Sequence, residues 1–152
     1  MKKLCRVYSI IITCSIMVLF TEVSIADDVI IPSKMSKEEI AGKIFERQTM
    51  VKTERDGGST TLDVLTNQSS DKKLETGMFK AGPGRFEITD GYGVDEFMYF
   101  LEGSVKLTSK DGSSQTINAG ESVVIQKEWS GIWETEGYTK IYVIYSSDTT
   151  TE

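Results

Sequence analysis

The chain has 152 residues, a length typical of one domain, and 17 basic against 23 acidic residues give it a formal net charge of −6. This acidity disfavours nucleic acid and anionic membranes as partners, because both repel a negatively charged surface. The chain contains no histidine, and its two cysteines, Cys5 and Cys14, lie near the N-terminus. We therefore expect neither thiol chemistry nor a bound transition metal, since the usual nitrogen and sulfur ligands are missing.

Residues 1–26 have the pattern of an export signal. Basic residues come first, the apolar run Val7–Phe20 follows, and the small residues Ser24 and Ala26 occupy the −3 and −1 positions of a cleavage site. The run is about 14 residues long, shorter than the roughly 20 needed to cross a bilayer. We expect an exported protein, periplasmic or secreted, that carries no cysteine after cleavage.

The segment 27–47 is expected to contain a short helix. Ser36 and Glu39 have the spacing of a capping box, and Ile40, Ile44 and Phe45 follow at helical spacing. This pattern predicts a helix over residues 37–45.

From residue 48 to residue 146 the pattern is that of strands. Short β-branched and aromatic runs alternate with turn signals such as Asp111-Gly112 and Glu136-Gly137, at a spacing of about ten residues. Such spacing without long helical runs predicts an all-β fold, an antiparallel sandwich or barrel. Residues 147–152 are expected to form a disordered tail.

The stretch EFMYFLEG, residues 96–103, reads as a strand that is apolar on both faces. Strand alternation places Glu96, Met98 and Phe100 on one face and the three residues between and after them on the other. Residues 141–145 repeat the pattern. A sheet face that is apolar on its outer side calls for a cover, so we expect a homodimer.

Three stretches resemble the cupin superfamily: TGMFKAGPGRFEITDGYGVDEFMYFLEG, EFMYFLEGSVKLTSKDGSSQTINAGESVVIQ and GIWETEGYTKIYVIY. More narrowly, they resemble the subgroup named for the cupin domain of ureidoglycine aminohydrolase, which has ethanolamine-utilisation relatives. The resemblance covers residues 76–145. It implies a cupin jelly-roll β-barrel over residues 48–146, with the short N-terminal helix outside it.

The metal-binding pattern of that superfamily is incomplete in this chain. The pattern has two histidines before a glutamate, a glycine seven positions after that glutamate, and a third histidine in a second motif. Glu96 and Gly103 match, whereas the first two histidine positions fall on Asp90 and Tyr92, or one residue earlier, and the third falls on Gly131. We therefore expect no metal and no cofactor, and the metal chemistry of the namesake enzyme is not carried over.

Glu96 would project into the barrel without a metal to neutralise it. A buried carboxylate must be protonated, paired or hydrogen-bonded, and Arg85, Lys140, Tyr92 and Tyr142 are the candidate partners. Glu96 is then either a paired structural residue or an acceptor for a ligand at the barrel mouth.

Trp129 and Trp133 are four residues apart, a spacing that places both rings on one face of a strand. They either pack in the core or a dimer interface, or they wall a pocket and stack on a planar or sugar-like ligand. The full set of candidate ligand-binding residues comprises Arg85, Asp90, Tyr92, Glu96, Met98, Trp129, Trp133, Lys140 and Tyr142.

Three functional hypotheses follow. The first is an exported cupin that binds a small polar or aromatic organic molecule without a transition metal. The second is a metal-independent isomerase, lyase or ureidoglycine aminohydrolase-like amidohydrolase with Glu96 as general acid or base, the one candidate catalytic residue. The third is a structural or interaction protein whose barrel is filled. An open, polar barrel around Glu96 would favour the first two.

Overall fold

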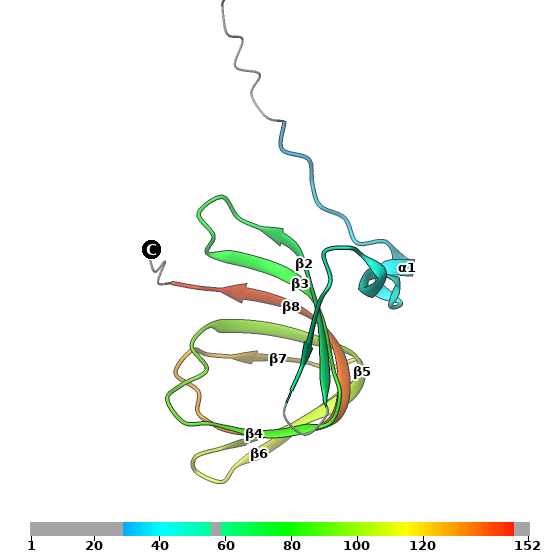
Figure 1. Cartoon of the computed structure of the whole chain (residues 1–152). Helices are drawn as coiled ribbons and strands as arrows, with labels where there is room; N and C mark the ends of the chain where they lie inside the picture. The colour runs from blue at the N-terminus through cyan, green and yellow to red at the C-terminus, as the bar shows by residue number, and fades with distance from the viewer. Residues whose placement is uncertain (1–28, 56–58, 148–152) are drawn as a thin grey trace, which may run out of the picture. The chain divides into compact units, whose positions relative to one another are not determined.

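The computed structural model describes residues 29–55 and 59–147 (Figure 1). The expected signal sequence and all but the first residue of the expected C-terminal tail lie outside these residues. The chain divides into two units, residues 1–31 and 32–152. Of the first unit only residues 29–31 are described, and they have no regular secondary structure. No helix of the described ranges is long and apolar enough to cross a membrane.

Two short helices stand where one was predicted. The α-helix α1 spans Lys37–Ile40 and the 3₁₀-helix η1 spans Lys43–Glu46. The capping box is present, because Ser36 accepts from the backbone of Glu39 and the Glu39 carboxylate accepts from the backbone of Ser36. The prediction of one continuous helix over residues 37–45 was wrong.

The interruption lies at Gly42. Its φ of +117° is outside the right-handed helical region, so the α-helix ends and the chain re-enters as a 3₁₀ turn. The 3₁₀ turn nevertheless directs the side chain of Ile44 toward the sheet. Ile44 is fully buried against Val64 and Met78. The helices thus cover one side of the sheet with an apolar cluster separate from the main core.

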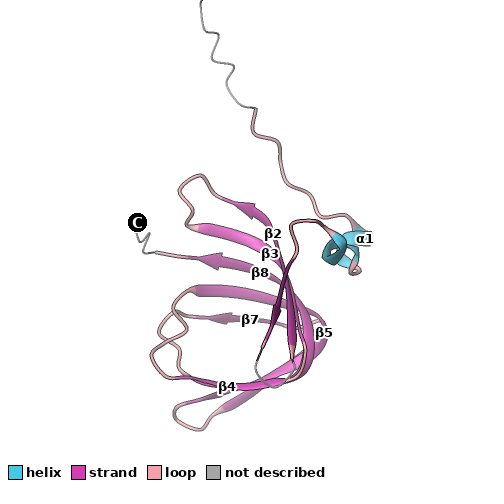
Figure 2. Ribbon diagram, viewed as in Figure 1, coloured by secondary structure: helices cyan, strands magenta, loops and turns pink. Residues whose placement is uncertain are grey.

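The rest of the described chain is built around eight antiparallel strands, which confirms the all-β, jelly-roll prediction (Figure 2). Their bounds are β1 Val51–Glu54, β2 Thr60–Gln68, β3 Leu74–Ala81, β4 Gly84–Ile88, β5 Asp95–Ser109, β6 Ser114–Asn118, β7 Ser122–Ile125 and β8 Gly131–Tyr145.

The long strands β5 and β8 bend and take part in two layers (Figure 1). In one layer the second half of β8 pairs with β3, and the first half of β5 pairs with β7. In the other layer the first half of β8 pairs with β4, and the second half of β5 pairs with β6. The two strands pair with each other along their length, with register shifts near the bend. This arrangement folds one sheet over itself and leaves an interior between the layers.

Gly103 and Gly137 lie side by side at this bend. Gly103 has φ +69°, and a Cβ added there would lie 2.0 Å from the carbonyl oxygen of Gly137. Only glycine meets both requirements, a left-handed backbone and a close approach of the facing chain. The glycine seven positions after Glu96 is therefore a structural requirement of the bend.

The predicted alternation along β5 is confirmed. Glu96, Met98 and Phe100 are buried, whereas Phe97 and Tyr99 are 41% and 39% exposed. The inward side chains of β5 continue the main core together with Val105, Leu107, Ile117, Ile125, Trp133 and Tyr138. The interior is therefore apolar at one end, and the polar residue Glu96 lies where the filled core gives way to open space.

Candidate ligand-binding site

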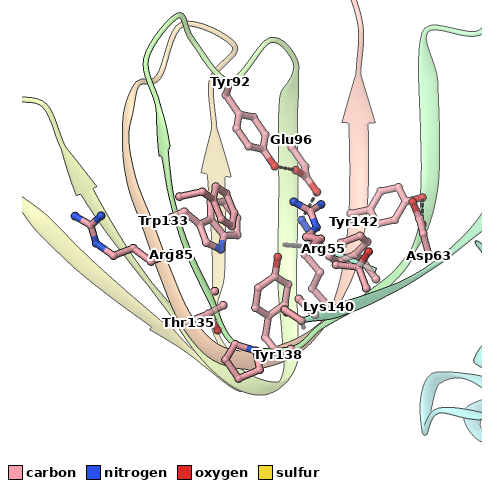
Figure 3. Close-up of a pocket in the computed structure, with 18 of the residues that line it drawn as sticks. Arg55, Asp63, Arg85, Tyr92, Glu96, Trp133, Thr135, Tyr138, Lys140 and Tyr142 are labelled. Carbon is pink, nitrogen blue, oxygen red and sulfur yellow. Dashed lines mark hydrogen bonds and ion pairs between the residues drawn. The ribbon is translucent and has the colours of Figure 1, made fainter. Parts of the chain in front are cut away.

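A cavity of about 800 Å³ opens between the layers (Figure 3). Its wall is built from the end of β1, from β2, β3 and β4, from Glu96 of β5 and from the inward face of β8. On β8 the alternation of a strand brings Tyr138, Lys140 and Tyr142 to the same side. The cavity lies beyond the apolar core cluster, so ionisable side chains and aromatic rings share its wall.

Glu96 and Lys140 form a buried ion pair in this wall. The Lys140 Nζ donates to Oε1 of Glu96 over 2.7 Å, and the two side chains are only 6% and 3% exposed. The other carboxylate oxygen of Glu96 accepts from the hydroxyl of Tyr92. Glu96 is therefore shielded from water, and both of its oxygens already have donors.

The other two expected partners of Glu96 face elsewhere. The Tyr142 hydroxyl donates to Oδ1 of Asp63 over 3.0 Å, and Arg85 Nε donates to Oε1 of Glu134 over 3.2 Å. As partners of Glu96, Tyr142 and Arg85 were therefore wrong predictions. Both still line the cavity.

Lys140 is surrounded by aromatic rings as well as by its carboxylate. Its Nζ lies 5.5 Å from the ring centre of Phe79, 5.6 Å from that of Trp133 and 5.9 Å from that of Tyr138. Burial lowers the pKa of Lys140, and the nearby Glu96 carboxylate opposes this effect. The site thus holds a cation whose charge is costly to bury and is balanced by one carboxylate.

Two phenols near Glu96 are held in their protonated form. Burial raises the pKa of Tyr92 and of Tyr138, and the charge of Glu96 adds to both effects. Tyr92 uses its proton in the hydrogen bond to Glu96. The hydroxyl of Tyr138 points into the cavity (Figure 3).

Trp133 lines the cavity and is 2% exposed, yet its Nε1 has no hydrogen-bond partner. Its ring is stacked with Phe86, with centres 5.8 Å apart, and with Tyr92, with centres 6.1 Å apart. Buried indole N–H groups usually have an acceptor. An acceptor for Trp133 can come from a molecule in the cavity.

Residues 68–142 match the family model of the EutQ-like cupin domain. The chain therefore carries a cupin-family domain. No curated protein matches the sequence.

Solved structures agree with this assignment at the level of the fold. The EutQ protein of Clostridium difficile is 21% identical with a TM-score of 0.51, over 62% of this chain and 74% of that chain. A DUF861-family protein of unknown function from Pseudomonas syringae is 21% identical with a TM-score of 0.55, over 62% of this chain and 43% of that chain. Identities this low show a shared fold and leave function open.

A metal ion, which cupin folds often imply, does not fit this cupin domain. The chain has no histidine, and no cluster of three potential ligand residues occurs among residues 29–55 and 59–147. Glu96 already holds the Lys140 ammonium. At Gly131, one of the three histidine positions of the family pattern, a Cβ would lie 2.2 Å from the backbone oxygen of Thr108. We therefore assign no metal-dependent chemistry to this site.

The predicted site residues divide into two groups. Those that line the cavity of the cupin domain are Arg85, Tyr92, Glu96, Trp133, Lys140 and Tyr142. Asp90, Met98 and Trp129 do not line it. Asp90 is exposed and accepts from Thr89, while Met98 is fully buried in the core, with its sulfur 3.0 Å from the Lys140 Nζ.

Trp129 lies outside the cavity for a local reason. β8 begins only at Gly131, so the strand alternation used to relate Trp129 to Trp133 does not extend to Trp129. The Trp129 Nε1 donates to Ser109 Oγ over 3.1 Å, and its side chain packs against the core cluster that contains Trp133, which bears out the core-packing alternative.

Sequence reasoning missed several polar residues of the cavity wall, among them Arg55, Asp63 and Tyr138. Tyr138 could have been found, because it precedes Lys140 by two positions and shares its face of the strand. Arg55 and Asp63 carry no such signal. They reach the cavity only because β1 pairs with β2, β2 with β3 and β3 with β8 in the folded sheet.

Proposed function

We propose that this cupin domain binds a small organic molecule in the cavity between its layers, without a transition metal. The observation that carries the proposal is the buried Nε1 of Trp133, which has no partner and lies in the cavity wall. Leaving such a group unpaired costs about 1–3 kcal/mol, which a ligand acceptor would recover. The cavity, at about 800 Å³, has the size of an ordinary small-molecule site.

A thermal-shift screen against a diverse panel of small polar and aromatic molecules tests this proposal. A ligand that binds only the folded state raises the midpoint of unfolding, and the stabilisation grows with the logarithm of the ligand concentration relative to its dissociation constant. The matched control is Ala81→Leu, which adds bulk to the cavity wall without removing a polar group. We expect panel members to stabilise the wild type and not the control. If no compound stabilises the wild type, the proposal fails and a structural or interaction role becomes the better account.

A metal-independent enzyme is the second candidate, because one further observation favours it. The hydrogen-bonded sequence Tyr92, Glu96, Lys140 joins a phenol, a carboxylate and an amine whose pKa is lowered by burial. Such a relay can supply and accept protons for an isomerase, a lyase or a ureidoglycine aminohydrolase-like amidohydrolase. The test is turnover of candidate substrates by metal-free protein. Activity lost in Glu96→Gln, with ligand binding retained, would establish catalysis.

We also propose that the mature protein is exported, on the basis of the basic start, the apolar run Val7–Phe20 and the Ser24 and Ala26 positions. Fractionation of expressing cells and N-terminal sequencing of the product test this. We expect the product to begin at Asp27. Recovery of the uncleaved chain in the cytosol would contradict it.

A further inference from the structure

The carboxylates in the cavity wall all have donors within the chain. Each makes at least one hydrogen bond to a neighbouring side chain, and the pairs are Glu96 with Lys140 and Tyr92, Asp63 with Tyr142, Glu75 with Gln68, and Glu54 with Lys52. Each of these carboxylates is therefore already engaged by a donor of the chain.

In contrast to these carboxylates, three hydrogen-bond donors of the same wall lack an acceptor among the described residues. Within the described part of the chain, Trp133 Nε1, the Tyr138 hydroxyl and the Arg55 guanidinium have no hydrogen-bond acceptor and no ion pair. Trp133 can only donate, and Arg55 is a permanent cation. Tyr138 keeps its proton, because burial and the charge of Glu96 raise its pKa.

These donors belong to one aromatic cluster. The ring centres of Trp133 and Tyr138 are 6.0 Å apart, and Trp133 is stacked with Phe86. The Arg55 guanidinium lies 6.0 Å from the ring centre of Phe86. Figure 3 shows Trp133, Tyr138 and Arg55 around the same open space. One molecule can therefore meet all three donors while its apolar part contacts the rings.

We propose that the ligand is a small aromatic carboxylic acid, whose carboxylate accepts from Trp133 and Tyr138 and pairs with Arg55. The inference rests on the proposed function and specifies its ligand class. A carboxylate supplies two oxygens in one plane, which match separate donors and the fork of a guanidinium. The planar body packs against the ring cluster through offset stacking.

The experiment compares arenes that differ only in the polar group. Benzoate, benzyl alcohol and benzylamine are titrated by calorimetry into the wild-type protein, together with the same series built on naphthalene and indole. We expect each carboxylate to bind at least about tenfold more tightly than its alcohol or amine, the factor that one charge-assisted hydrogen bond supplies.

Single-residue variants test which donors bind the ligand carboxylate. Trp133→Phe and Tyr138→Phe keep an aromatic ring and remove one donor, so each should weaken carboxylate binding about tenfold and leave alcohol binding within about twofold. Arg55→Gln removes the cation from an exposed position and should act in the same direction. Trp129→Phe is the matched control, because that indole donates to Ser109 and does not line the cavity. Its binding should equal that of the wild type.

The outcomes separate a wrong ligand class from a wrong proposed function. If alcohols or amines bind as tightly as carboxylates, or if only non-aromatic compounds bind, the inference is overturned while the proposed function stands. Unchanged preference in Trp133→Phe, Tyr138→Phe and Arg55→Gln overturns it as well. If no compound of any class binds, both proposals fall. Should one aromatic variant not fold, Arg55→Gln and the other aromatic variant still decide.

Discussion

Lys140 and Glu96 lie 44 residues apart in sequence, yet the ammonium of one contacts the carboxylate of the other at 2.7 Å inside the protein. Both residues are almost completely buried. Removing two charges from water is costly, and the mutual attraction offsets this cost only while both charges are present.

A double-mutant cycle on this pair should show strong coupling. Glu96→Leu leaves the Lys140 ammonium buried without its carboxylate, and Lys140→Met leaves Glu96 with only Tyr92, so each should lower the free energy of unfolding by about 3–5 kcal/mol. The double variant replaces both charges by apolar groups and should lose less than either single variant. Urea denaturation measures all four proteins. Additive losses would contradict the prediction.

Glu96→Gln separates the charge from the shape of the residue. Glutamine keeps the side-chain length and can still hydrogen-bond, so we expect a folded protein with a loss of about 1–3 kcal/mol. If Glu96 serves only to hold Lys140 in place, the affinity for a ligand found in the thermal-shift screen should be unchanged in this variant. If Glu96 contributes to the site directly, affinity should fall. Calorimetry on the folded variant distinguishes the two outcomes.

Asp63 should make stability depend on pH in an unusual direction. Burial raises the pKa of Asp63 above its ordinary value near 3.8, although the Tyr142 hydroxyl opposes this. The native state then binds the proton more tightly than the unfolded state, so this group's contribution to stability is full at low pH and is lost as pH rises through the folded pKa. Asp63→Asn should therefore gain stability relative to the wild type as pH rises.

The control for that experiment is Asp111→Asn. Hydrogen bonds from Ser113 lower the pKa of Asp111, so its contribution has the opposite sign and is lost as pH falls. Thermal unfolding between about pH 3 and pH 7, on either side of the usual carboxyl pKa, measures both variants. A common sign for the two would contradict the assignment.

Gly103→Ala should destabilise the protein by more than about 2 kcal/mol, because it combines a positive φ with a steric clash. The added Cβ would meet the carbonyl oxygen of Gly137 at 2.0 Å. Gly112 also has a positive φ, +84°, but faces open space. Gly112→Ala should therefore cost only about 1–2 kcal/mol. Equal midpoints in chemical denaturation would argue against the close contact at the bend.

The outer face of β5 is the expected dimer contact. Phe97 and Tyr99 are exposed there, and Val124 of the neighbouring strand β7 is 64% exposed. We expect a wild-type dimer in sedimentation experiments and a monomer for Tyr99→Lys or Phe97→Lys. The control Val51→Lys changes an exposed residue on β1, at the edge of the sheet, and should remain a dimer. A monomeric wild type at micromolar concentration would refute the expectation.

Elemental analysis should find less than one equivalent of any transition metal in protein purified without a chelator. The reason is the ligand set, since no histidine is present and Glu96 is engaged by Lys140. A chelator should leave the unfolding midpoint unchanged. One tightly bound manganese, iron, nickel or zinc ion would overturn this prediction.

Local features of the chain could be predicted from sequence because short-range geometry determines them. The period of two along a strand was enough to place Glu96 inside with Met98 and Phe100. The capping box at Ser36 was readable for the same reason, whereas the length of the helix was not, because the conformation of Gly42 ended it. The turn spacing likewise predicted the all-β fold.

The composition of the site depended on strand pairing, which single-sequence patterns do not encode. Glu96 had four candidate partners, and only the β5–β8 pairing brought Lys140 to it, while β4–β8 pairing took Arg85 to Glu134. Long-range register is selected by burial of whole strand faces and shifts at bulges, such as the one between Phe100 and Glu102. The sequence therefore determined which way each side chain points along its own strand. Only the tertiary structure decided which side chains meet, because that is set by packing among residues far apart in the chain.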